Sequence, residues 1–481
     1  MKPDEVARRH SLWPAFLVTA PVAYANRFRT AFLATLLAMA AVLLLQPLFV
    51  FALIQVRSHT DLASARLHVL AAFDEGVLDD EQQPRLFINR GGHQFTECTA
   101  LNLMLDDGQN FLTTALMPRL HFEFIDPCPE LHKTAAGIAA PIMTDYSRYW
   151  HGYRIYMWPL LERFSLQSVR FINAFLTLCA LTFFYCGLRG AIGPTPAFIF
   201  FVVLMSLTDI WRMWVNTPHF IAMFIILVGS AAFVYVRRKT ANGYAAIVCA
   251  AVLGSVFNFV DFLSNPPMMP MLLSFFVLAA RDNLGAPQLA RGLRKLPLAM
   301  MVAASWFGGY AMTWLVKWIL AAYLSADAHQ TILGITDQIL LRLYGQEPNG
   351  HIYFLPLLPT LTMIIQSFIS VGSVTVAVLA AAIVLHLHKN WASFDKRVFV
   401  RLLLPTLIPI IWFELLSNHT QTHSHFTYRS ESAAIALVFA AASMATNPPT
   451  NVRLLLGNLW SHLWRASQRS AHRRQSAGDA R

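Results

Sequence analysis

The stretch TAFLATLLAMAAVLLLQPLFVFALI, residues 30–54, contains no charged side chain. A run of about 20 apolar residues is long enough to cross the hydrocarbon core of a membrane as a helix. The whole chain of 481 residues is 56% hydrophobic and only 13% charged, which is too few charges to cover the surface of a soluble globule. The sequence therefore predicts an all-α, polytopic membrane protein.

Similar apolar runs recur along the chain and predict about ten transmembrane helices. They lie at 30–54, 168–187, 194–210, 217–236, 243–262, 266–281, 297–324, 357–387, 398–416 and 430–447. The expected organisation has five parts: a basic N-terminal segment at 1–29, a first transmembrane helix at 30–56, a large loop at 57–167, a transmembrane bundle at 168–447 and a basic tail at 448–481.

The positions of lysine and arginine predict the orientation of these helices, because short loops rich in these residues stay in the cytoplasm. The opposite segments are nearly bare, with Arg212, Arg342 and Arg429 as exceptions. We therefore expect both termini in the cytoplasm and the 57–167 loop outside. The basic segments contain Arg8, Arg9, Arg27 and Arg29; Arg237, Arg238 and Lys239; Arg291, Arg294 and Lys295; Lys389, Lys396 and Arg397; and the tail from Arg465 to Arg481.

The net charge of +11 has the same origin. Basic loops on the inner side contact anionic lipid, so we expect membrane lipids rather than nucleic acid as partners. The N-terminal stretch lacks the short apolar region and small-residue cleavage site of a signal peptide, and the first helix is expected to stay attached.

The large loop at 57–167 is expected to fold outside the membrane, with amphipathic helices at the interface around FTECTALNLML and 148–163. It contains two of the five cysteines, Cys98 and Cys128. In an oxidising compartment two such cysteines favour a disulfide, which would stabilise the loop by a few kcal/mol at most. Two unpaired thiols are the alternative.

Four polar stretches are expected to lie together on the outer face. They are YSRYWHGYR at 146–154, NFVDFLSNPP at 258–267, WFGGYAMTWLVKW at 306–318 and NHTQTHSHFTYR at 418–429. Tryptophan and tyrosine alone would form an interfacial belt, and this alternative stays open for 306–318. Ionisable groups at a membrane are costly and usually mark a binding site or a substrate path, so the four stretches together favour a functional site.

The positive and hydrogen-bonding groups of these stretches suit an anionic ligand. Arg429 offers a planar fork to a phosphate, Lys317 a point charge, and His419, His423 and Tyr428 hydrogen-bond donors. Two alternatives stay open for the histidines. They could bind a divalent metal, because His419 and His423 are four residues apart, although the glutamate of HExxH is missing. They could also donate hydrogen bonds to loop carbonyls.

The plan of one helix, a large outer loop with carboxylates and many further spans resembles the GT-C class of polyprenyl-phosphate-dependent glycosyltransferases. The phrases RYWHGYRIYMWPLL, FNFVDFLSNPP and NHTQTHSHFTYR are similar to those of a bacterial family of polytopic membrane proteins of obscure function. In GT-C enzymes an acidic residue of the first outer loop is the general base, and later outer ends hold the lipid phosphate. The GT-C pattern has an acidic pair soon after helix one, where this sequence has only Asp61.

The resemblance implies a glycosyltransferase of the bacterial inner membrane that moves a sugar from a polyprenyl-phosphate donor to a glycan, lipid or protein acceptor. A base must be rigidly held and partly desolvated, which favours Glu97 over the solvated run LDDEQQPR, with the Asp74-Glu75 pair as the alternative base. Asp261 is a further candidate, although it could instead cap a helix or pair with Lys317 or Arg429. A transporter or flippase of a lipid-linked or anionic solute is the alternative function, and a non-catalytic scaffold is the third. The expected sugar-binding residues are Tyr149, Trp150, His151, Tyr153, Asn265 and Asn418.

Overall fold

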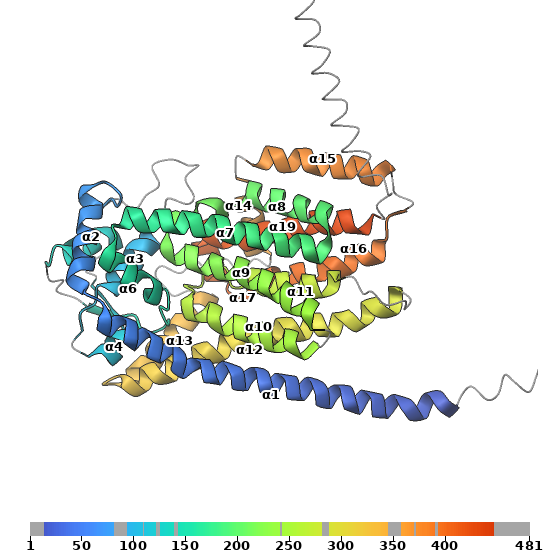
Figure 1. The fold of residues 1–481 in the computed structure, drawn as a ribbon, viewed down its shortest axis with the longest axis horizontal. Coiled ribbons are helices and arrows are strands. Elements are labelled where there is room, and N and C mark those ends of the chain that lie inside the picture. Colours follow the sequence, from blue (N-terminus) through green and yellow to red (C-terminus); the bar gives the residue numbers. More distant parts are fainter. Residues whose placement is uncertain are drawn as a thin grey trace, which may run out of the picture.

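The computed structural model of the protein describes residues 14–80, 94–108, 110–121, 126–138, 143–240, 243–280, 288–344, 357–369, 372–389 and 393–446. Almost all of this part of the chain is helical, as the sequence predicts, and the helices run roughly along one long axis (Figure 1). Residues 1–13 of the predicted N-terminal segment and the whole predicted tail at 448–481 lie outside the described residues.

A small domain covers one end of the molecule, which we call the domain end (Figure 1). Its two short strands are antiparallel, with Arg119 opposite Asp145, so the structure adds a two-stranded sheet to the predicted all-α fold. The disulfide between Cys98 and Cys128 joins two of its helices. The domain contains α2 (Leu62–Asp74), α3 (Phe95–Met104), α4 (Phe111–Leu116), β1 (Arg119–His121), α5 (Pro127–Ala135), β2 (Met143–Asp145) and α6 (Arg154–Arg163).

The remaining elements form a helical bundle that extends away from this domain (Figure 1). Its long first helix is α1 (Pro14–His59). The others are α7 (Leu166–Ile192), α8 (Pro194–Leu207), η3 (Ile210–Val215), α9 (Thr217–Lys239), α10 (Gly243–Val260), α11 (Met268–Ala279), α12 (Gln288–Leu324), α13 (Ala328–Tyr344), α14 (Leu358–Phe368), α15 (Ser373–Lys389), α16 (Lys396–Leu403), η5 (Leu404–Thr406), α17 (Leu407–Leu415), α18 (Ser417–Thr422) and α19 (Ser424–Ala445).

Six helical segments in the described residues are long and apolar enough to cross a membrane, rather than the expected ten. They are Phe32–His59, Leu166–Ile192, Thr217–Lys239, Gly243–Val260, Lys295–Leu324 and Lys396–Leu415. A seventh is present if α14 and α15, which bend by 100°, form one broken span. The expected spans at 194–210 and 266–281 are the shorter apolar helices α8 and α11, and the expected span at 430–447 falls in α19, which is not among the six. At 1.5 Å per residue neither α8 nor α11 reaches the roughly 30 Å of a hydrocarbon core.

The domain is firmly packed onto the bundle. The ring of Trp150, in the segment before α6, lies 5.8 Å from that of Phe259 at the end of α10. The backbone N–H of Gly152 donates to the carbonyl of Phe259 at 2.8 Å, an approach that a side chain at position 152 would block. The indole of Trp150 donates to the carbonyl of Thr313 in α12. These contacts fix the segment before α6 against two helices of the bundle.

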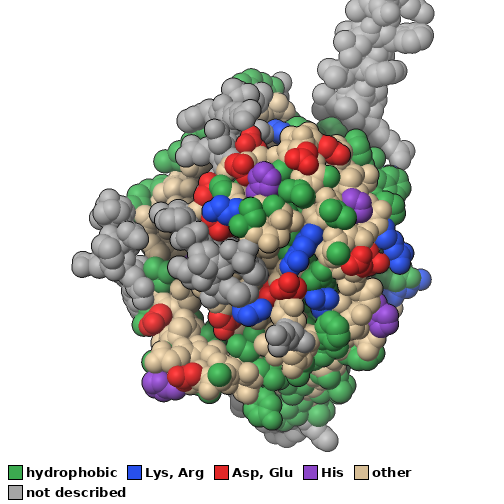
Figure 2. Space-filling model, turned by 90° about the vertical axis from the view of Figure 1, so that its left-hand side faces the viewer, with side chains coloured by type: hydrophobic (Ala, Val, Ile, Leu, Met, Phe, Trp, Pro, Cys, Tyr) green, Lys and Arg blue, Asp and Glu red, His purple; other side chains and the backbone are tan. Residues whose placement is uncertain are grey.

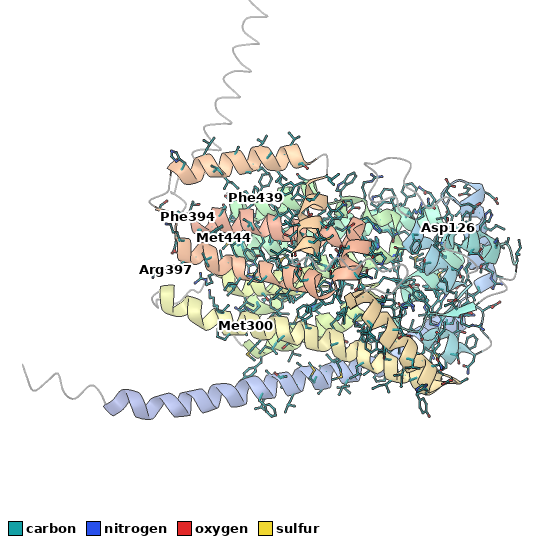
Figure 3. The ribbon with its side chains drawn as sticks, turned by 180° about the vertical axis from the view of Figure 1, so that it is seen from behind. Asp126, Met300, Phe394, Arg397, Phe439 and Met444 are labelled. Atoms are coloured by element: carbon teal, nitrogen blue, oxygen red, sulfur yellow. A yellow bond between two sulfur atoms is a disulfide. The ribbon has the colours of Figure 1, made fainter. Side chains whose placement is uncertain are left out.

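The two ends of the molecule can be told apart by their residues. The face that the domain presents has acidic, basic and histidine side chains close together among polar atoms (Figure 2). Phe394, Arg397 and Met444 lie at the opposite end from Asp126 (Figure 3). We call this opposite end the far end. The chain between α15 and α16 and the end of α19 meet there, where the N–H of Asp395 donates to the carbonyl of Ala445 at 2.9 Å.

Candidate functional site

The four polar stretches of the sequence meet at the domain end. The ring of Tyr149 lies 5.7 Å from that of Phe262 and 6.2 Å from that of Trp314. The imidazole of His419 lies 3.1 Å from the carbonyl oxygen of Leu263. Contacts between the 146–154, 258–267, 306–318 and 418–429 stretches therefore build one continuous group of side chains.

We call this group the domain-end cluster. It joins basic side chains to aromatic rings around one buried carboxylate. Its members are Tyr146, Arg148, Tyr149, His151, Asp261, Phe262, Tyr310, Trp314, Arg342, His419, His423 and His425.

Two arginines flank the ring of Tyr149. Arg342 donates to the Tyr149 hydroxyl at 2.7 Å, and its guanidinium carbon lies 5.8 Å from the ring centroid. Arg148 lies 5.7 Å from the same ring and 3.7 Å from the ring of Tyr146. Neither arginine forms an ion pair with a carboxylate in the described part of the chain. Two half-buried guanidinium groups without a carboxylate partner favour the binding of an anion.

His419 supplies a hydrogen bond rather than a charge. The Leu263 carbonyl only accepts, so Nε2 of His419 carries the proton that it donates. Burial, with His423 and Arg342 nearby, keeps the pKa of His419 well below its usual range. Its ring lies 4.6 Å from that of His423, which is half-buried and stacks on Phe426. Of the histidine roles that the sequence left open, hydrogen bonding to a loop carbonyl is the one His419 has.

Asp261 is the carboxylate of the cluster. It directly follows α10 and is 3% exposed. Its oxygens accept from the N–H groups of Leu263 and Ser264 at 2.9 and 3.0 Å and from the Ser264 hydroxyl at 2.7 Å. The Tyr310 hydroxyl is a fourth and more distant donor at 3.4 Å. Burial raises the pKa of Asp261 to about 6. Asp261 therefore stabilises a turn and pairs with neither Lys317 nor Arg429.

Lys317 lies outside the cluster because it binds the end of a helix in the domain. Its ammonium group donates to the carbonyl of Leu116. Arg154 donates to the two preceding carbonyls, those of Thr114 at 2.9 Å and Ala115 at 2.5 Å. These carbonyls end α4, where helix carbonyls lack partners and attract cations. Both cations are fully buried, so the predicted phosphate-binding lysine fastens α12 to the domain.

Arg429 and Tyr428 also lie outside the cluster, since both bind Asp209. Arg429 forms a two-pronged ion pair through Nε at 2.6 Å and Nη2 at 2.8 Å, and the Tyr428 hydroxyl donates at 3.0 Å. This carboxylate neutralises the arginine that the sequence assigned to a phosphate. The contact joins the start of α19 to the residues that follow α8.

The other predicted catalytic carboxylates also lie outside the domain-end cluster. Glu97 is buried and pairs with Arg170 of α7 at 2.7 Å, and it accepts from the Thr217 hydroxyl at the start of α9 at 3.3 Å. Removing one partner of such a buried pair leaves an uncompensated charge. Asp74 and Glu75 are exposed at the end of α2. Among the four predicted catalytic carboxylates, Asp261 alone belongs to the domain-end cluster.

The predicted sugar-binding residues divide in the same way. Tyr149 and His151 belong to the cluster, whereas Trp150 donates to Thr313 and packs between buried rings. The remaining three bind backbone carbonyls: Tyr153 binds Ala100 at 3.2 Å, Asn418 binds Leu341 at 2.7 Å, and Asn265, with its amide nitrogen turned toward it, binds Phe426 at 3.1 Å.

Asp61, the acidic residue nearest to the first span, caps a helix. Its carboxylate accepts from the N–H groups of Ala63 and Ser64 and from the Ser64 hydroxyl, so it begins α2. These hydrogen bonds lower the pKa of Asp61.

Six cluster residues lie in the four polar stretches but were not singled out by the sequence: Tyr146, Arg148, Phe262, Tyr310, Trp314 and His425. Arg342 was noted only as an exception to the charge pattern. Its place on the expected outer side, where basic residues are rare, was the available signal for it.

The described residues contain no group of three or more histidine, cysteine or acidic side chains that could hold a metal ion. The protein was also compared with protein-family models, curated proteins and solved structures, and none of them matches. The chemistry of the cluster is therefore argued from its own geometry.

Proposed function

We propose that the protein is a membrane glycosyltransferase that takes a sugar from a polyprenyl-phosphate-linked donor. The domain end would face the outside of a bacterial inner membrane, and the domain-end cluster would bind the donor phosphate. The observation that carries the proposal is the pair of arginines around Tyr149, which have no carboxylate partner in the described residues and lie beside aromatic rings.

The cluster offers complementary groups to both parts of such a donor. Arg148 and Arg342 would neutralise the phosphate, whose negative charge grows as it leaves. The rings of Tyr146, Tyr149 and Trp314 offer apolar faces to a sugar, and the two tyrosines also offer hydroxyl groups. In a partly desolvated site these fixed groups stabilise developing charge more strongly than water does.

Sugar transfer also needs a group that accepts a proton. An acceptor hydroxyl would attack the anomeric carbon, the bond from that carbon to the phosphate oxygen would break, and its electron pair would stay on the phosphate. The proton of the hydroxyl would pass to Asp261. A carboxyl with a pKa of about 6 suits this role, and its longest contact, to Tyr310 at 3.4 Å, is the one that an acceptor would replace.

A transporter or flippase of the same class of lipid is the second candidate. One observation favours it: α14 and α15 bend by 100° at a short break. Transporters often build their binding sites from such broken helices. The arginines of the domain-end cluster lie near the ends of the spans rather than near their middle, which favours the transferase.

The test is donor binding and sugar transfer by the purified protein in nanodiscs, with polyprenyl phosphate as the binding probe. Arg342→Gln should weaken binding about 10- to 150-fold, the equivalent of about 1.5–3 kcal/mol for a lost hydrogen bond to a charged group. The control is Arg66→Gln, which breaks a surface ion pair with Asp107 and should leave binding unchanged.

Asp261→Asn separates the two chemical roles. The variant should still bind polyprenyl phosphate, while transfer should fall about 100-fold or more through loss of the base. Its melting temperature reports whether the turn after α10 survives. Lipid translocation without any glycosidic product would replace the transferase with the transporter. Loss of activity on chelation, restored by zinc, would assign the histidines to a metal.

A further inference from the structure

Helix α13 follows α12 after a short turn and lies at the domain end (Figure 1). The turn is well defined, because the N–H of Asp327 donates to the Ser325 hydroxyl and the N–H of Gln330 donates to the Asp327 carboxylate. The helix therefore begins at a fixed point immediately beyond the apolar segment Lys295–Leu324.

One side of α13 is fastened to the protein. The amide of Asn418 in α18 donates to the carbonyl of Leu341, and Arg342 donates to the hydroxyl of Tyr149, both at 2.7 Å. Ile335 on the same side is only 9% exposed. This side faces α18 and the domain-end cluster.

The other side of α13 is apolar and exposed. Ile332 is 54% exposed and Ile339 37% exposed, and they lie seven residues apart on one face of the helix. Leu333 and Leu340 widen this stripe, and both are also exposed. Exposed apolar stripes of this kind mark contact with a membrane or another protein.

The stripe continues one that already belongs to a span. Leu315, Ile319 and Tyr323 are exposed on α12 at intervals of four residues, which places them on one face. Since α12 is a candidate membrane span, this face meets lipid acyl chains, and Tyr323 lies at its end as interfacial tyrosines do. The exposed apolar stripe of α13, which follows α12 in the chain, is then expected to contact the same membrane.

We infer that α13 lies in the headgroup layer of the membrane at the domain end, with Ile332, Leu333, Ile339 and Leu340 against lipid acyl chains. Amphipathic helices adopt this position when one face is apolar and the other polar. The inference goes beyond the proposed function, because it requires no sugar transfer. It has one consequence for the cluster: Arg342 is held at the depth of lipid phosphates, which reach it sideways from the leaflet.

The experiment is photocrosslinking of the full-length protein in phospholipid nanodiscs. A benzophenone amino acid is placed at Ile332 or Ile339, and the control positions are Gln330 and Asp337, each two residues away and exposed. Two residues turn an α-helix by about 200°, so each control points about 160° away from its partner. Mass spectrometry should find phospholipid adducts at positions 332 and 339 and none at positions 330 and 337.

The four variants are compared only if their melting temperatures match that of the unaltered protein. Equal adducts at all four positions, or crosslinks from 332 and 339 to protein alone, would overturn the inference. Adducts at 332 and 339 in a protein that transfers no sugar would leave this inference standing and reject the transferase, so the two proposals fail separately.

Discussion

At the scale of single residues, His151 combines burial with an uncommon backbone conformation. It is 1% exposed and has a φ of 57°, in the left-handed region. Its Nε2 donates to the carbonyl of Tyr146 at 2.9 Å. Burial keeps the pKa of His151 well below its usual range, and the positive charges of Arg154, Lys317 and Arg148 act in the same direction.

The low pKa of His151 predicts that acid destabilises the protein. An unfolded chain has a histidine pKa of about 6.5 and binds a proton below that pH, whereas folded His151 does not. Stability should therefore fall as the pH decreases from about 6.5 toward the folded pKa, by up to about 1.4 kcal/mol per pH unit. The drop in melting temperature between about pH 7.5 and about pH 5.5 should be smaller in His151→Asn, since asparagine tolerates positive φ.

His59→Asn is the control for this pH effect, because His59 is exposed at the end of α1. The control should keep the full drop in melting temperature. A drop that is equal in His151→Asn and in the unaltered protein would contradict the assignment of the acid effect to His151.

The sequence identified charged residues near the domain end but could not identify their partners. Arg429 looked available for a phosphate, and its partner Asp209 lies in a distant part of the chain. Lys317 looked similar, and its acceptor is a backbone carbonyl that no pattern of side chains reveals. The disulfide between Cys98 and Cys128 was easier to predict, because both partners are cysteines within one loop.

At the scale of elements, α10 and α12 approach closely at two glycines. A Cβ added to Gly254 would lie 2.1 Å from the Trp306 carbonyl oxygen, and one added to Gly309 would lie 2.0 Å from that of Ala251. A polar contact supports the packing, since the hydroxyls of Ser255 and Thr313 are 2.7 Å apart. Small residues at helix contacts are typical of membrane bundles.

This packing predicts different outcomes at two adjacent glycines. Gly309→Ala should destabilise the protein by about 1–3 kcal/mol, because the methyl group would push against backbone that cannot move aside. Gly308→Ala should leave the free energy of unfolding unchanged or raise it by up to about 1 kcal/mol, because alanine has the higher helix propensity. A methyl group there meets only the flexible end of Met39, at 3.4 Å. Thermal unfolding in detergent compares the two variants, and equal melting temperatures would contradict the close approach.

The number of spans was harder to predict than the presence of helices. Apolar composition identified α8 and α11, but their ends depend on tertiary packing. The chain leaves the helical path at Thr208 and again at Asp261, where buried groups such as the Ser264 N–H bind side-chain oxygens. A hydropathy window averages over such breaks, so it could not predict how short these two apolar helices are.

At the scale of the whole molecule, several basic loop segments lie toward the far end, opposite the small domain, although the domain end has basic side chains of its own (Figure 2). Arg397 marks the far end and Asp126 the domain end (Figure 3). α9 finishes with Arg237, Arg238 and Lys239, and it starts beside Glu97 of the domain. The sequence predicted this separation, because the Lys and Arg content of a loop and its length can both be read from one short stretch of the chain. The meeting of four distant polar stretches in one cluster followed from the same alternation of spans.

The last prediction is the topology in the membrane. Reporter fusions after residues 240, 290 and 392 should report the cytoplasm, and fusions near 110, 340 and 421 should report the outside. The physical reason is the retention of Lys- and Arg-rich segments on the inner side. This pattern requires the short apolar helices α8 and α11, together with their flanking residues, to carry the chain back across the membrane. Position 340 lies in α13, so an outside signal there agrees with a helix in the outer headgroup layer. The controls are fusions within α9, which should give an intermediate signal as a span does.

An inverted pattern would place the domain-end cluster in the cytoplasm without changing any of its contacts. Arg148 and Arg342 would still bind an anion, but a donor in the outer leaflet would not reach them, and the proposed transferase would be rejected. If position 392 were outside and position 421 inside, the number of spans between α13 and α18 would be odd. In that case α14 and α15 would form a re-entrant loop, which their 100° bend also permits, and the single segment Lys396–Leu415 would cross alone.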